Sequence, residues 1–230
     1  MRTFLLTPLL LATLVVAAPA QNCPDVADES HHQLLYSNAE VRVFLLELPR
    51  LAATDAHCHS HPFFYVVVSE GRSSSTPEGQ VTFSHDWRGG DTQFVLNPVK
   101  HVIRNEGINP HREIIVESLR PIQYRPLDGN YDTDLLVGDL GSTKPTWTIT
   151  VARGTMSASK TQLVPGAEYV PQGPRQVLIA LSDMQFKRER EGLPAQTLDL
   201  SAQDVQVFSG DTTRLTNTGS RPARFITVEF

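Results

Sequence analysis

Two windows of the sequence, residues 105–117 and 217–229, share one pattern at an offset of 112 residues. They read NEGINPHREIIVE and NTGSRPARFITVE, with seven identities in the frame N-x-G-x-x-P-x-R-x-I-x-V-E. A second pair of segments, GDTQF from Gly90 and QDVQV from Gln203, is offset by 113 residues. Self-similarity at a nearly constant offset indicates that the chain holds two copies of one domain.

Both copies consist of short β-rich segments separated by turn residues. Examples are VRVFLLEL, FFYVVVSE and REIIVESL in the first copy, and WTITVAR, RQVLIALS and ARFITVEF in the second. Valine, isoleucine, phenylalanine and threonine favour strands, and many short strands with turn signals are typical of an all-β sandwich or barrel. We expect one β domain over residues 35–122 and another over 145–230, joined by a Pro-, Gly- and Asp-rich linker at 123–144.

The first twenty residues are typical of a secretory signal peptide. Arg2 precedes an apolar run that ends in the small residues APA before Gln21, and the run is short for a membrane span. Cleavage after Ala20 would leave 210 residues that begin with an N-terminal arm, residues 21–34. We therefore expect an exported protein, periplasmic or secreted, without a membrane anchor after cleavage.

Charge excludes one class of partner. The mature chain would carry 19 basic and 25 acidic residues, a net charge of about −6, and these charges are scattered along the sequence. Nucleic-acid-binding proteins instead concentrate basic residues in one patch. We expect no nucleic-acid partner.

The chain has two cysteines, Cys23 and Cys58. In an oxidising compartment an even number of cysteines is compatible with a disulfide. The bond would tie the N-terminal arm to the segment HCHSH at 57–61. The alternative is two unpaired thiols, and both interpretations stay open because the sequence gives no distance between them.

The segment HCHSH contains three histidines at alternate positions. Alternate residues of a strand share one face, so His57, His59 and His61 point one way and Cys58 points the other. The first and last are about 13 Å apart on a regular strand, whereas a metal–imidazole bond is about 2 Å long. Two neighbouring histidines can share one ion, but all three cannot. The alternative is an ordinary polar strand end.

A further candidate ligand is His101, in GDTQFVLNPVKHVIRN, three residues after Pro98 and four before Asn105. A histidine pair entering a β segment, followed by a Gly-Asp strand, a proline turn, a histidine and an asparagine, resembles the two motifs of the cupin superfamily. The duplicated chain is similar to bicupins, which implies two tandem jelly-roll β-barrels. The resemblance also implies a divalent transition metal (Fe, Zn, Ni, Mn or Cu) held by His59, His61 and His101, with His57 as the alternative to His61.

The sequence departs from this family pattern in two ways. Many metal-binding cupins carry a glutamate four or five residues after the second histidine, where this chain has apolar or aromatic residues, so we expect a bare three-histidine site. In the second copy the three histidine positions read Gln172, Pro174 and Thr213, and no histidine follows His111. We expect the C-terminal barrel to bind no metal by this route and to act as a scaffold.

The remaining histidines are expected at the surface or in turns: His31, His32, His85 and His111. Asn105 is expected to form a turn, since Asn-x-Gly recurs in both copies. The resemblance implies a metal-dependent enzyme of the dioxygenase, isomerase or decarboxylase type, acting on a small oxygenated molecule. The alternatives are a non-catalytic protein that binds a small molecule and a structural β-barrel protein, and a homodimer is compatible with each.

Overall fold

The computed structural model describes residues 23–120, 147–153, 156–171, 175–209 and 213–230. The expected signal peptide and the linker at 123–144 lie outside these residues. No helix in the described part of the chain is long and apolar enough to cross a membrane. The only helical element among the described residues is a short 3-10 turn, η1 (Val26–Asp28).

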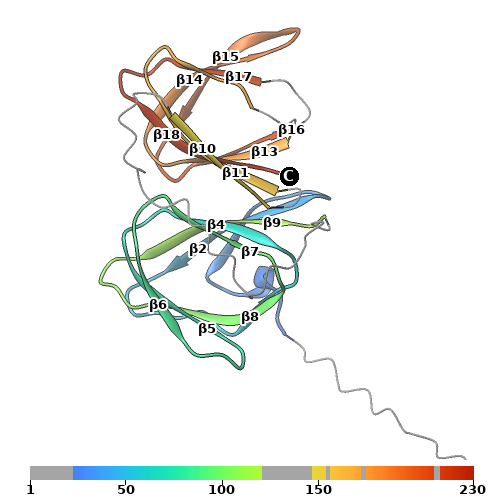
Figure 1. The fold of residues 1–230 in the computed structure, drawn as a ribbon, viewed down its shortest axis with the longest axis vertical. Helices are drawn as coiled ribbons and strands as arrows, with labels where there is room; N and C mark the ends of the chain where they lie inside the picture. The colour runs from blue at the N-terminus through green and yellow to red at the C-terminus, as the bar shows by residue number, and fades with distance from the viewer. Residues whose placement is uncertain (1–22, 121–146, 154–155, 172–174, 210–212) are drawn as a thin grey trace, which may run out of the picture.

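The described chain forms two β-barrels (Figure 1). The strands of the first barrel are β1 (His32–Ser37), β2 (Val41–Leu48), β3 (His57–His59), β4 (Phe63–Val67), β5 (Gly71–Pro77), β6 (Phe83–Trp87), β7 (Asp91–Val95), β8 (Val99–Asn105) and β9 (His111–Ser118). Those of the second barrel are β10 (Trp147–Arg153), β11 (Met156–Leu163), β12 (Glu168–Tyr169), β13 (Arg175–Ala180), β14 (Met184–Arg190), β15 (Leu193–Leu200), β16 (Val205–Ser209), β17 (Thr213–Asn217) and β18 (Ala223–Glu229).

The two barrels have the same topology. In the first, a five-stranded sheet has the order β1-β2-β9-β4-β7 and a four-stranded sheet the order β3-β8-β5-β6. In the second, the orders are β10-β11-β18-β13-β16 and β12-β17-β14-β15, so every strand has a counterpart nine strands later. The all-β barrels predicted from the sequence are therefore confirmed, and the matching strand orders support the predicted duplication.

The repeated Asn-x-Gly pattern forms the same turn twice. In the first barrel the side-chain amide of Asn105 donates to the Leu48, Pro49 and Asn109 carbonyls, and its oxygen accepts from Gly107 N at 2.8 Å. In the second, Asn217 donates to the Leu163 and Arg221 carbonyls and accepts from Gly219 N. Each asparagine satisfies buried backbone groups at the turn that leads into the last strand of its barrel.

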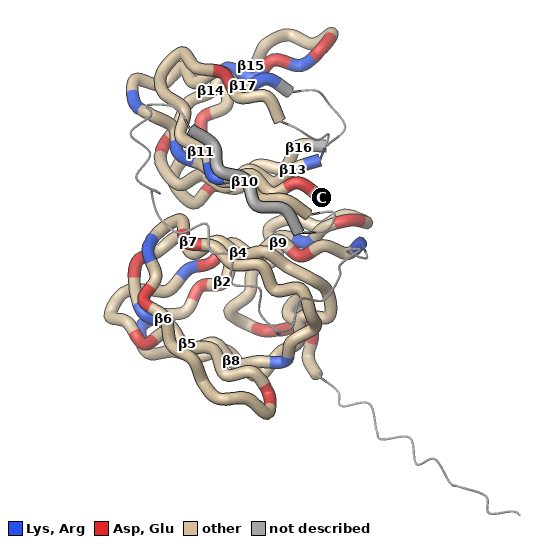
Figure 2. Tube along the Cα trace, viewed as in Figure 1, with Lys and Arg blue, Asp and Glu red and all other residues tan. Residues whose placement is uncertain are grey.

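The barrels pack through the outer faces of their five-stranded sheets. One apolar cluster joins Phe64, Phe94 and Val116 of the first barrel to Ile179 and Ile226 of the second. A sheet covered on both faces needs nearly continuous apolar strands, which explains the segment FFYVV of β4. Figure 2 shows residues of both charge signs interspersed along the two barrels, as expected from the scattered charge.

The inner faces differ between the barrels. In the second, the interior is apolar and includes Leu178, Phe186 and Phe225. In the first, an apolar cluster that includes Phe44 and Ile115 shares the interior with buried histidines and carboxylates. Among the described residues, buried histidines are found in the first barrel alone.

Candidate metal centre

Strand β3 carries the histidine pair into the first barrel. It pairs antiparallel with β8, with His57 opposite His101 and His59 opposite Val99. His57 and His59 are fully buried, and His101 is 8% exposed. The ring centroids of His57 and His101 lie 4.7 Å apart, and those of His59 and His101 5.4 Å apart. The pair that the structure brings to His101 is thus His57 and His59, which the sequence analysis held as the alternative.

His61, one of the three preferred ligands, lies beyond the end of β3. It is half-buried on the short connection to β4. The ring contacts described for the cluster involve His57, His59 and His101 rather than His61. The strand ends at His59, so alternation no longer holds His61 on the same face.

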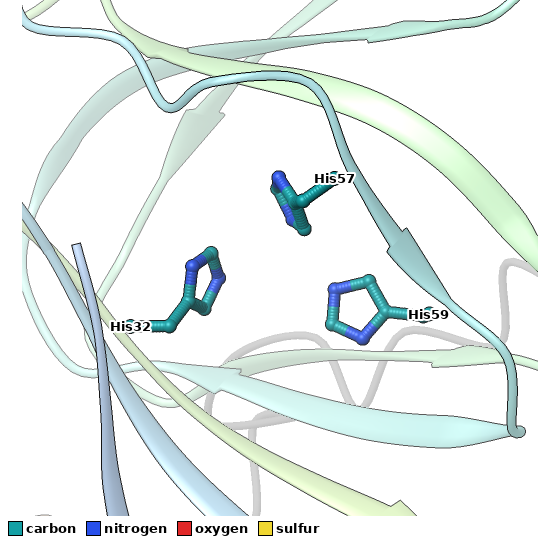
Figure 3. Close-up of side chains that lie close together, drawn as sticks. All are labelled: His32, His57 and His59. Atoms are coloured by element: carbon teal, nitrogen blue, oxygen red, sulfur yellow. The ribbon is translucent and has the colours of Figure 1, made fainter. Parts of the chain in front are cut away.

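A fourth histidine joins the cluster from the N-terminal arm. His32 opens β1 opposite Leu46, and its ring centroid lies 4.7 Å from that of His57 and 6.1 Å from that of His59. Each of these three residues offers a ring nitrogen within 4.8 Å of the other two. Figure 3 shows the rings of His32, His57 and His59 around one space. His32 and His59 each point one ring nitrogen into that space.

The expectation of a surface position for His32 is wrong. Its side chain is 1% exposed, because its pairing with β2 turns it into the barrel. The same expectation is wrong for His111, which is 2% exposed and bonds through Nε2 to Glu113 Oε1 at 2.7 Å. His111 is the first residue of β9, and Glu113 follows on the same inward face. His85 is exposed, as expected.

On each of the four rings Nδ1 faces an oxygen atom of the surrounding protein. His57 Nδ1 lies 3.0 Å from the Asp55 carbonyl, and His101 Nδ1 lies 3.2 Å from Ser75 Oγ. His32 Nδ1 lies 2.6 Å from Glu29 Oε2. His59 Nδ1 lies 3.7 Å from Glu117 Oε1, which is beyond hydrogen-bond distance. Metal-binding histidines have this arrangement, in which an oxygen partner fixes the tautomer and orients the other nitrogen.

The remaining ring nitrogens fit a metal ion. Nε2 of His57 and Nε2 of His101 are buried and have no hydrogen-bond partner. An unsatisfied buried polar atom costs about 1–3 kcal/mol, and coordination to a metal would satisfy both atoms. The donor set of imidazole nitrogens suits Zn, Cu, Fe and Ni. The residues therefore fit the divalent transition metal that the sequence predicts.

The histidines are held in the neutral form that a metal requires. Burial, with repulsion from neighbouring histidines, lowers the pKa of His59 and of His101 well below the usual value. Burial also lowers the pKa of His57. Burial and the neighbouring His57 lower the pKa of His32 to about 4, although Glu29 opposes this shift. Protons therefore compete weakly for these nitrogens near neutral pH.

A carboxylate that the sequence analysis missed, Glu117, lies beside His59. It is fully buried on β9, opposite Arg42 on β2 and Phe63 on β4. Its Oε2 accepts from Arg42 Nε at 2.6 Å, and Arg42 also pairs with Asp25 of the arm. Burial raises the pKa of Glu117, with Arg42 opposing the shift. The expected glutamate position after the histidine pair is apolar, but strand β9 supplies a carboxylate to the same interior.

Cys23 and Cys58 form a disulfide bond, which settles the question that the sequence left open. Their Cα atoms are 5.8 Å apart, within the usual range for a disulfide. Cys58 points away from its histidine neighbours because it occupies the middle position of β3.

Comparisons with solved structures identify the architecture. No family model and no curated protein sequence matches the chain. AerE from Microcystis aeruginosa aligns with a TM-score of 0.62 at 12% identity, over 86% of this chain and 96% of that one. The salicylate 1,2-dioxygenase of Pseudaminobacter salicylatoxidans aligns with a TM-score of 0.60 at 14% identity, over 84% and 72%. These neighbours are cupin proteins. The chain has the cupin fold.

A further cupin structure, the oxalate decarboxylase of Bacillus subtilis described with Mn(II) centres, aligns with a TM-score of 0.57 at 13% identity, over 83% of this chain and 68% of that one. At such identities the likeness concerns the fold alone. In the second barrel of this chain, β17 begins at Thr213, the counterpart of His101. The other two counterparts, Gln172 and Pro174, lie outside the described residues.

Proposed function

We propose that the first barrel binds a divalent transition metal through His57, His59 and His101 and that the protein is a metal-dependent enzyme. The observation that carries the proposal is the pair of buried, unpartnered Nε2 atoms on His57 and His101, beside His59 on the same face of β3. When bound, the ion would polarise an oxygenated substrate or activate dioxygen. This range covers the dioxygenase, isomerase and decarboxylase classes.

The protein's own side chains would prepare the site. The Asp55 carbonyl and Ser75 hydroxyl orient the rings of His57 and His101. Glu117, fixed through Oε2 by Arg42, offers its free Oε1 to the Nδ1 proton of His59. This contact would raise the basicity of His59 and hold its ring in place.

A small oxygenated molecule is the proposed substrate. The apolar cluster with Phe63 and Ile115 lines the interior near the histidines, and the stacking of His59 on Phe63, with centroids 4.1 Å apart, excludes water from one side of the ring. The names of two structural neighbours, a salicylate dioxygenase and an oxalate decarboxylase, support a small carboxylate or phenol. Apolar walls with a few convergent polar groups are typical of sites for such molecules.

The burial of the centre favours a second candidate function, a metal- or small-molecule-binding protein without turnover. The rings of the four histidines are nearly inaccessible to solvent. This candidate predicts a bound metal and a ligand that is recovered unchanged after long incubation with metal and oxygen.

We also propose that the protein is exported. The apolar leader supports export, and the Cys23–Cys58 disulfide is compatible with an oxidising compartment. N-terminal sequencing of protein from the medium or periplasm tests this: a start at Gln21 supports it, and an intact leader on cytosolic protein contradicts it.

The test of metal binding uses the mature chain from Gln21 and elemental mass spectrometry. A variant with His57→Ala and His101→Ala removes both unpartnered nitrogens, and His85→Ala, at an exposed position of the same barrel, is the matched control. We expect about one equivalent of metal in the wild type and in the control, and its loss in the double variant. Metal content unchanged in the folded double variant would overturn the proposal.

If a metal is found, its identity directs the assays. Iron would direct them to oxygen-dependent reactions, and zinc or nickel to acid–base and decarboxylation reactions. Consumption of a carboxylate or phenol by the wild type but not by the double variant would favour the enzyme over the binding protein.

A further inference from the structure

The described part of the N-terminal arm, residues 23–34, is built into the first barrel beside the histidines. Element η1 contacts β1 and β3, and Val26 is fully buried in the apolar cluster of the interior. Asp25 caps η1 by accepting from Ala27 N at 2.9 Å and pairs with Arg42 at 2.8 Å. The backbone N–H of Cys58 donates to the Pro24 carbonyl at 2.8 Å. The arm is thus attached to the same strand that carries His57 and His59.

Glu29 fixes the end of the arm. Its carboxylate accepts from His31 N at 2.9 Å and from Asp55 N at 3.3 Å, and it bonds His32 Nδ1 at 2.6 Å. Burial alone would raise the pKa of Glu29, but the hydrogen bonds from His31 and His32 hold it at about 2. With Nδ1 of His32 engaged by a carboxylate, Nε2 is the nitrogen left for a ligand.

We propose that His32 is a fourth nitrogen ligand of the metal and that the Cys23–Cys58 disulfide tethers it to the site. The inference rests on the proposed function and adds a ligand that lies outside both cupin motifs. Its basis is the position of His32, whose ring nitrogen lies within 4.8 Å of those of His57 and His59. Two bonds of about 2 Å span at most about 4 Å, so a bound ion would draw together any pair of these nitrogens that lies farther apart.

The tether has a physical effect on affinity. His32 opens an edge strand, and strand ends fray more readily than strand centres. A disulfide between the arm and β3 limits how far His32 can move from His57 and His59, which keeps its effective concentration at the metal high. Four neutral imidazoles would also favour Zn, Cu, Ni or Fe over metals that prefer oxygen ligands.

The arm also supplies a matched control. His31 contacts the same carboxylate through its Nδ1, at 2.9 Å from Glu29 Oε1, but its side chain is 29% exposed. His31→Ala therefore removes a comparable contact with Glu29 and leaves the four-histidine cluster intact. His32→Gln keeps an amide donor for Glu29 but replaces the ligand nitrogen, so it serves if His32→Ala folds poorly.

The experiment measures the affinity of the mature protein for Zn²⁺ and Co²⁺ by competition with a chromophoric chelator. We expect His32→Ala and His32→Gln to weaken binding by at least about tenfold at unchanged stoichiometry, with an altered Co²⁺ absorption spectrum. His31→Ala should stay within about twofold of the wild type. Thermal unfolding of each metal-free variant reports whether the barrel is intact.

A double-mutant cycle tests the tether. The variant Cys23→Ser/Cys58→Ser should bind the metal more weakly than the wild type. Adding His32→Ala to that variant should reduce metal affinity by a smaller factor than it does in the wild type, because both changes act on the same ligand. Wild-type affinity in His32→Gln, with binding abolished by His57→Ala and His101→Ala, would overturn the fourth ligand and leave the proposed function standing. A wild-type chain that binds neither ion would overturn both.

Discussion

His59 Nδ1 and Glu117 Oε1 face each other at 3.7 Å inside the first barrel, and neither atom has a hydrogen-bond partner. The two residues are far apart in sequence, but His59 stacks on Phe63 of β4, and Phe63 is the residue that pairs with Glu117 on β9. A small movement of either side chain would make a hydrogen bond. We take this pair as the contact that orients His59 when a metal is bound.

Replacing Glu117 by Gln should weaken metal binding by about 10- to 100-fold, as is usual when the oxygen partner of a ligating histidine is changed. The physical reason is that a neutral amide raises the basicity of His59 less than a carboxylate does. Chelator competition measures the change, with Glu78→Gln, a half-exposed residue paired with Lys100, as control. Equal metal affinities in the two variants would show that Glu117 does not orient His59 for metal binding.

Stability of the metal-free protein should fall as the pH drops from about 6.5 towards 4. The pKa of His32 is about 4 in the folded protein and about 6.5 in an unfolded chain. Between these two pH values the unfolded chain binds a proton at His32 and the folded protein does not, so acidification favours unfolding. Above pH 7 the residue is neutral in both states, and no stability is lost. For one histidine the difference is about 3 kcal/mol. The raised pKa of Glu117 acts in the opposite direction and offsets part of it.

Urea unfolding at several pH values, with a chelator present, measures this dependence. The His32→Gln variant should show a shallower loss across the same window, since one depressed pKa has been removed. A wild-type stability that is flat or rises on acidification between pH 6.5 and 4 would mean that the histidines are not buried in the neutral form.

Removing the disulfide should destabilise the first barrel. Cys23 and Cys58 are separated by 35 residues, and closing a loop of that size stabilises a fold by up to about 4 kcal/mol through the entropy of the unfolded chain. The midpoint of urea unfolding for Cys23→Ser/Cys58→Ser should therefore move to lower urea. An unchanged midpoint would show that the arm is held by Val26, Asp25 and Glu29 alone.

Asn105→Ala and Asn217→Ala should both destabilise the protein, because each asparagine is 1% exposed and satisfies backbone groups at its turn. Leaving a buried acceptor without a donor costs about 1–3 kcal/mol. Only Asn105 lies in the barrel that carries the histidines, so only its variant should also weaken metal binding. Equal metal affinity in the two variants would show that the turn does not help to position β8 and His101.

The sequence predicted the fold well because duplication leaves a signal that one chain can reveal. The shared frame that begins at Asn105 and Asn217 marks the same turn and the same final strand in both barrels. Alternation along β3 likewise predicted that His57 and His59 share a face, and the motif around Pro98 pointed to His101. These signals are local or repeated, so they can be recognised in the sequence alone.

The parts of the site that the sequence did not reveal depend on tertiary pairing. His32 follows an acidic stretch and resembles a surface residue until β1 is paired with β2, which turns it inward. Glu117 lies in the repeated frame, but only its register with Phe63 brings it to the histidines. His61 was preferred because it precedes the YVVV segment closely, whereas the strand ends before it. In each case, the pairing register rather than the residue type decides what lies inside.

We propose above all that His57, His59 and His101 hold one metal ion in the first barrel. Anomalous diffraction at the zinc edge, from crystals of the mature chain soaked in Zn²⁺, tests it most directly. We expect one strong peak about 2 Å from ring nitrogens of these three residues, with the ring of His32 beside it. Peaks confined to surface histidines such as His85, with none among the buried rings, would contradict it.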